Sequence, residues 1–81
     1  MILPTKHTKV EQSLLGFGGY ILQILDDNST IDSIWQEYIK DLNNNNYPAK
    51  HSFDNLLLTL VFLFAINAIE EKEGFIRKCN Y

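Results

Sequence analysis

The chain has 81 residues, a formal net charge of −3, and 46% hydrophobic and 12% aromatic residues. This length allows one domain with a thin core, and the apolar content excludes a disordered chain. A single cysteine excludes an internal disulfide scaffold, and the acidic balance lacks the basic patch typical of nucleic-acid binding.

A short strand and a long helix are expected first. Residues 1–5 are apolar up to Pro4, which favours a short N-terminal edge strand. A first helix is expected from Thr8 to Asp26, because apolar residues recur on one face at helical spacing: Val10, Leu14, Phe17, Ile21, Ile24 and Leu25. Glycines at 16, 18 and 19 each cost a helix about 1 kcal/mol. They indicate close approach of another helix or a bend, and the sequence leaves open whether the helix continues through them.

The second helix has a clear start and stop. Ser29 or Thr30 caps it, and Ser29 with Asp32 fits the capping-box pattern. The helix is expected to run to about residue 42, with an apolar stripe formed by Ile31, Ile34, Trp35, Tyr38 and Leu42. The asparagine run at 43–46 and the following proline indicate a loop.

A third helix and a hairpin complete the pattern. Ser52 is a good N-cap, and the helix is expected to end near Asn67 in the left-handed conformation. Residues 69–78 are typical of a β-hairpin that turns at Gly74. We therefore expect one cytoplasmic winged helix-turn-helix domain over residues 1–81, of mainly helical α+β class. The third helix takes the recognition position, the hairpin is the wing, and the N-terminal strand would extend the wing.

The third helix carries the most apolar segment of the chain. From Leu56 to Ile69 only Thr59 and Asn67 are polar, and no residue is charged. A membrane-spanning helix needs about 20 apolar residues, so this segment is too short and we expect no contact with a membrane. The N-terminal residues also lack the pattern of a signal peptide.

On a helical wheel, the third helix divides into two apolar faces. The expected core face consists of Phe53, Leu56, Leu57, Leu60, Val61 and Phe64. The opposite face holds Ala65 and the three larger residues Leu58, Phe62 and Ile66, and an exposed apolar patch usually marks an interaction site. We predict a protein interface at these three residues; the alternative is that the first helix, the N-terminal strand or the wing covers them.

Direct sequence-specific reading of DNA is not expected from this helix. Between Phe53 and Asn67 there is no Lys or Arg for phosphates or bases, and Asp54 would repel the backbone. Weakly basic positions occur near both ends of the chain, at Lys6, Lys9, Arg77 and Lys78. They would contact nucleic acid together only if the terminal strand pairs with the wing, and a solvated surface is the simpler interpretation.

No pattern indicates catalysis. His7, His51 and Cys79 lack metal-ligand spacing. Adjacent carboxylates at 26–27 and 70–71 make poor acid–base pairs, because sequence neighbours do not face each other on a helix. We therefore expect no enzyme activity and no catalytic, cofactor-binding or metal-binding residues.

Several stretches together resemble the middle component, type 6, of the ABC three-component systems. They are ILPTKH (2–7), SLLG (13–16), TIDSIW (30–35), SFDN (52–55) with residues 60–69, and GFIR (74–77). The opening Ile-Leu-Pro-x-Lys-His is the most distinctive, and the resemblance spans nearly the whole chain. It implies a small winged-helix adaptor without catalytic residues. Such adaptors are encoded beside an SMC-like ABC ATPase and an effector-bearing protein, in bacterial conflict or antiphage defence modules.

Three functions remain open at this point. The chain is a non-catalytic adaptor of a defence complex, a winged-helix DNA-binding transcription regulator, or a homo-oligomer, such as a homodimer, that uses the same apolar face. The absence of a basic recognition helix favours the first over the second, and the third is compatible with the first.

Overall fold

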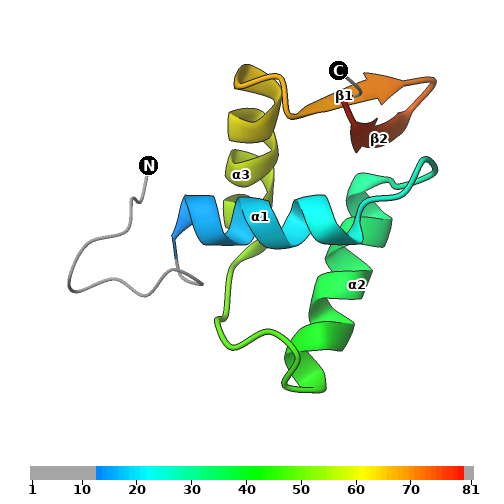
Figure 1. Ribbon diagram of the computed structural model, residues 1–81. Helices are drawn as coiled ribbons and strands as arrows, with labels where there is room; N and C mark the ends of the chain where they lie inside the picture. Colours follow the sequence, from blue (N-terminus) through cyan, green and yellow to red (C-terminus); the bar gives the residue numbers. More distant parts are fainter. Residues whose placement is uncertain (1–12, 80–81) are drawn as a thin grey trace.

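The computed structural model describes residues 13–79. Figure 1 shows three helices followed by a hairpin, in the order α1 (Leu14–Ile24), α2 (Ile31–Asn43), α3 (Phe53–Ala65), β1 (Ile69–Lys72) and β2 (Phe75–Lys78). Helix α1 packs against both other helices, and β1 packs against α3. The predicted mainly helical α+β class, with a winged-helix-like layout, is thus confirmed. The predicted N-terminal edge strand lies outside the described residues.

Each helix begins at a hydroxyl side chain that accepts a backbone hydrogen bond. Ser13, Thr30 and Ser52 accept from the N–H groups three residues ahead, at 3.0, 3.0 and 3.1 Å. Ser13 has an extended backbone. The predicted bounds of this helix, Thr8 and Asp26, are therefore wrong: α1 starts at Leu14, after its N-cap Ser13, and ends at Ile24. Residues 8–12 lie outside the described residues.

Thr30 and Ser33 form the capping box of α2, instead of the predicted pair Ser29 and Asp32. Thr30, not Ser29, is the N-cap, and its own N–H donates to Ser33 Oγ at 2.8 Å. Ser33 therefore takes the role that the Ser29–Asp32 pattern assigned to Asp32. Ser29 is instead buried, and its carbonyl accepts a hydrogen bond from the hairpin.

Asparagines in the left-handed conformation end two helices. Asn45 has φ of 58° and Asn67 has φ of 60°. After α3 the N–H of Ala68 donates to the Leu63 carbonyl at 2.9 Å, which satisfies a carbonyl of the last turn. The predicted end of α3 near Asn67 is confirmed. The asparagine run after α2 has the same physical role.

The hairpin turns on two residues and is attached to the start of α2. Glu73 and Gly74 both have positive φ, of 56° and 86°, which suits a tight turn and confirms Gly74 as its turn residue. The strand β2 pairs with β1 on one side, and the Ile76 N–H donates to the Ser29 carbonyl on the other at 2.7 Å. The hairpin therefore lies at a fixed position beside both α2 and α3.

Aromatic side chains fill the core between α1, α2 and the loop that follows α2. Phe17 is fully buried and stacks on the His51 ring, with centroids 4.0 Å apart and an interplanar angle of 1°. The Tyr38 ring meets Phe17 edge-on at 5.1 Å. Nearby, burial and the hydrogen bond to Asp41 raise the pKa of Tyr20, so its hydroxyl stays a neutral donor. This cluster fixes the position from which α3 starts.

Tyr38 ties the loop between α2 and α3 to this core. Its hydroxyl donates to the Ala49 carbonyl at 2.8 Å and accepts from the His51 N–H at 2.6 Å. Tyr38→Phe would leave both backbone groups unpaired in a buried place, so we expect the free energy of unfolding to fall by about 1–3 kcal/mol. Urea denaturation followed by circular dichroism measures this loss. An unchanged midpoint would contradict the role given to the hydroxyl.

The glycines of α1 have different surroundings. The helix is continuous through them. A Cβ placed on Gly18 would lie 3.3 Å from Leu63 Cδ2 and 3.6 Å from Thr59 Cγ2, both on α3. A Cβ on Gly19 would meet nothing within 4 Å among the described residues. Close approach of another helix, one of the two predicted reasons for the glycine run, is therefore confirmed at Gly18.

Substitutions at the two adjacent glycines are expected to have opposite effects. Gly19→Ala should stabilise the fold by about 0.5–1 kcal/mol, because it removes the glycine penalty and fills only open space. Gly18→Val should destabilise it by about 1–3 kcal/mol, because its methyl groups crowd α3. Thermal unfolding of both variants measures the difference. A Gly18→Val protein as stable as Gly19→Ala would show that α1 and α3 are not closely packed there.

Candidate protein interface on α3

The core face of α3 differs from the predicted one. The buried residues of the helix are Leu56, Thr59, Leu60 and Leu63. Four residues predicted for the core are instead exposed: Phe53, Leu57, Val61 and Phe64. Because α3 is apolar around its whole circumference, the sequence pattern does not fix its rotation. The close contact with α1 at Gly18 fixes it.

The wheel analysis missed two buried residues of α3, Leu63 and the polar residue Thr59. The Thr59 hydroxyl donates to the Asn55 carbonyl at 2.6 Å, so the polar atom is satisfied within the helix. Its methyl group then faces Gly18 across the helix contact. A threonine can therefore occupy this buried position, and its contact with Gly18 lets the two helices approach closely.

This rotation turns a continuous apolar strip toward solvent. The strip consists of Leu57, Leu58, Val61 and Ala65, which are exposed and neighbour one another at spacings of three and four residues. We call these four residues the outer surface of α3. Val61, at its centre, is 63% exposed. The charged residue beside it on α3 is Asp54, in the first turn.

The three predicted interface residues have different environments. Leu58 belongs to the outer surface and is 46% exposed. Ile66 is the C-cap of α3 and is also exposed. Phe62 is half-buried and packs against the hydrophobic core. The structure thus joins Leu58 to Leu57 and Val61, which the sequence pattern had placed in the core; that these residues bind a partner stays a prediction.

The predicted nucleic-acid contacts are only partly within the described residues. Arg77 Nε donates to Glu70 Oε1 at 3.0 Å across the hairpin, which offsets its charge. Lys78 is exposed at the end of β2. Lys6 and Lys9 lie outside the described residues. A basic surface shared by all four remains a prediction.

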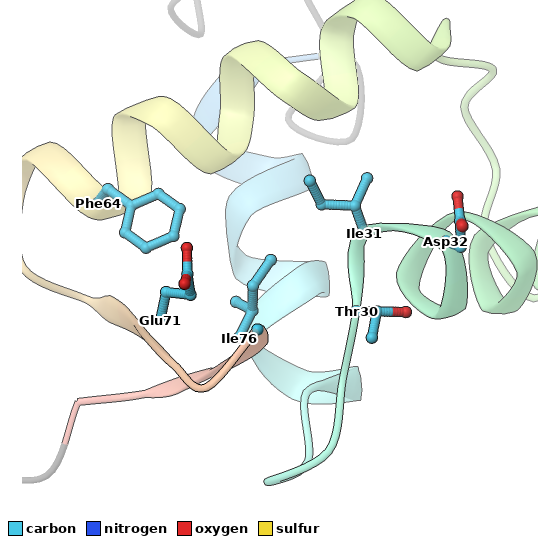
Figure 2. Close-up of a pocket in the computed structure, with 7 residues that line it drawn as sticks. Thr30, Ile31, Asp32, Phe64, Glu71 and Ile76 are labelled. Atoms are coloured by element: carbon cyan, nitrogen blue, oxygen red, sulfur yellow. The ribbon is translucent and has the colours of Figure 1, made fainter.

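A pocket of about 440 Å³ lies where α2, α3 and the hairpin meet. Figure 2 shows Phe64, Ile31 and Ile76 around it, with the carboxylate of Glu71 beside the Phe64 ring. Its other lining residues are Thr30, Asp32 and Gly74. Phe64 follows Val61 by three residues on α3, so the pocket adjoins the outer surface. The pocket therefore combines apolar side chains with two carboxylates and no basic residue.

Two other kinds of site find no support in the described part of the chain. Within residues 13–79, no group of three or more His, Cys, Asp or Glu side chains is placed to hold a metal ion. None of the helices in this range combines the length and apolar character that crossing a bilayer requires.

Comparison with known protein families identifies a match over most of the chain. The family model described as the ABC-three component (ABC-3C) system Middle Component 6 matches residues 3–79. No curated protein and no solved structure matches the chain significantly. The matched range covers every helix and strand described above, the outer surface of α3 and the pocket beside it.

Proposed function

Because the chain belongs to the ABC-three component (ABC-3C) system Middle Component 6 family, we propose that it is a non-catalytic adaptor in a bacterial conflict or antiphage defence complex. In this proposal it acts in the cytoplasm and bridges an SMC-like ABC ATPase and an effector subunit encoded nearby. The description of the family as a middle component supports a role among the other proteins of a multi-component system.

The observation that carries the proposal is the chemistry of the outer surface of α3. In a helix-turn-helix layout, this helix occupies the position from which base edges and phosphates are read. A DNA-reading helix needs Arg, Lys, Asn or Gln there. This helix instead presents leucine, valine and alanine beside Asp54. An exposed apolar surface of this kind is suited to bury itself against another protein.

Electrostatics also favours a protein partner over DNA. The chain carries a formal net charge of −3, and α3 has no Lys or Arg. Binding to duplex DNA gains most of its affinity by releasing counterions from phosphates that basic side chains neutralise. The basic side chains within the described residues include Arg77, whose charge is already offset by Glu70. The described surface therefore supports the transcription-regulator alternative less well than a protein partner.

Co-expression with the neighbouring genes tests the proposal. A tagged chain is expected to co-purify with the ATPase and the third protein in constant ratio through high salt, because apolar contacts are not weakened by screening. A chain that elutes alone and shifts duplex DNA would instead support the transcription regulator. Light scattering of the pure chain shows whether it also forms the homodimer that remains compatible with the adaptor role.

A further inference from the structure

Glu71 is an exposed carboxylate in the middle of β1. In a strand, side chains two residues apart share a face, so Glu71 lies on the same side of β1 as the buried Ile69. Its cross-strand partner is Ile76, which is also buried. The opposite side of the hairpin carries Glu70, which pairs with Arg77. Glu71 therefore belongs to the side of the hairpin that faces the helices.

The surroundings of Glu71 offer apolar contacts but no positive charge. Its carboxylate lies beside the exposed ring of Phe64 and opens onto the pocket that Ile31 and Ile76 line (Figure 2). Among residues 13–79, the one ion pair is that of Arg77 with Glu70. None of the residues that line the pocket is Lys, Arg or His. The pocket is thus mainly apolar, with two carboxylates and no basic side chain among its lining residues.

The second carboxylate of the pocket is already partly compensated. Asp32 lies in the first turn of α2, where the positive end of the helix dipole stabilises a negative charge. Figure 2 also shows its side chain at the far edge of the pocket, away from Phe64. Glu71 has no such compensation, because it is a strand residue. The strongest attraction for a cation therefore lies between Glu71 and Phe64.

Arginine is the side chain whose chemistry matches this combination. Its stem packs on aliphatic surface, and its planar guanidinium both stacks on an aromatic ring and binds a carboxylate through two donors. We propose that the pocket receives an arginine side chain of the protein that docks on α3. Its stem would lie against Ile31 and Ile76, and its guanidinium would lie between Glu71 and Phe64. This inference rests on the proposed adaptor function and adds the chemistry of the partner.

Charge complementarity selects this occupant over a second copy of the chain. Two copies with a net charge of −3 each would repel at long range, whereas a basic partner segment is attracted to the pocket. The apolar outer surface next to the pocket would supply the larger buried area. We therefore expect a partner segment that presents apolar residues to α3 and an arginine to the pocket.

The affinity of the full chain for the purified ATPase and for the purified third protein tests this pairing. Glu71→Gln removes the charge with little change in shape, and the control Glu73→Gln removes a charge in the same hairpin outside the pocket. We expect Glu71→Gln to weaken binding of one component about tenfold, and Glu73→Gln to change it by less than about twofold. Circular dichroism confirms that both variants remain folded.

Arginine itself is tested by charge exchange. Glu71→Arg is expected to abolish binding, and changing the partner's arginines to Glu one at a time is expected to restore it at one position. Restoration at no position would overturn the assignment of an arginine. If Glu71→Gln changes self-association of the chain in light scattering instead, the occupant is a second copy and the inference is wrong.

The binding data distinguish an error in the arginine site from an error in the adaptor function. If Glu71→Gln binds as well as the unmodified chain while Val61→Asp does not bind, the pocket holds no arginine but the docking surface stands. If the unmodified chain binds neither component, the adaptor function is wrong and the arginine site is rejected with it.

Discussion

Val61→Asp is expected to abolish the binding of partner proteins while leaving the free chain folded. The side chain is 63% exposed, so an aspartate there meets water in the free protein. In a complex that buries the outer surface of α3, the same carboxylate would be desolvated without a partner. We expect a loss of affinity of about 100-fold or more, equivalent to about 3 kcal/mol. Isothermal titration with the co-purified component measures it.

A matched substitution separates this effect from a general loss of apolar surface. Leu15 on α1 is 49% exposed and lines a hollow beside residues 46–48 that contains no α3 residue, so Leu15→Asp should bind normally. Leu58→Asp should behave like Val61→Asp. Phe62→Asp is expected to lower stability as well, because Phe62 packs against the core. Normal binding by Val61→Asp would remove the outer surface of α3 from the interface.

Phe17→Ala is expected to lower the free energy of unfolding by about 3–5 kcal/mol, the usual loss for a buried phenylalanine. The ring is fully buried and contacts the His51 and Tyr38 rings, at 4.0 and 5.1 Å between centroids. Domains of this size have a small free energy of unfolding, so the variant should be largely unfolded at room temperature. Circular dichroism in a urea titration measures the loss.

The control for this variant lies on the same helix. Leu15→Ala shortens an exposed side chain two residues away and should change the free energy of unfolding by less than about 0.5 kcal/mol. Similar losses for both variants would mean that α1 does not bury the face described here. A folded, stable Phe17→Ala protein would place the core elsewhere.

Several helix ends and the hairpin turn could be predicted from the sequence, because their signals are local. Ser52 and Thr30 were recognisable as caps, and Asn67 and Gly74 as residues that adopt positive φ. These signals act within a few residues of the backbone groups that they satisfy. Together they fixed the order of helices and hairpin, and with it the winged-helix-like layout.

Features set by distant contacts were not predictable in the same way. The rotation of α3 depends on the contact of Gly18 with Thr59 and Leu63, which no local sequence pattern predicts. The apolar pattern alone therefore placed Val61 in the core. Ser29 looked like a cap, but its carbonyl accepts a hydrogen bond from Ile76, far away in the chain. The sequence pattern showed Glu71 only as half of an adjacent carboxylate pair, because only the packed hairpin brings it beside Phe64.

The apolar surface itself was recognisable, but its composition was not. A helix apolar on all sides in a small domain leaves one face uncovered whichever way it turns. The sequence therefore predicted an exposed apolar face and correctly placed Leu58 on it. It could not show that Leu57 and Val61 share this face, nor that Phe62 is half-buried.

Methyl NMR spectroscopy of the full chain tests the central claim most directly. The chain has two valines, Val10 and Val61, so the methyl signals of Val61 are readily assigned. On addition of the purified ATPase or third protein, the signals of Leu57, Leu58 and Val61 are expected to shift or broaden, while those of Leu15 stay unchanged. Duplex DNA should leave all of them unchanged. Unmoved α3 signals in a saturated complex, or shifts with DNA alone, would contradict a protein-docking role for this surface.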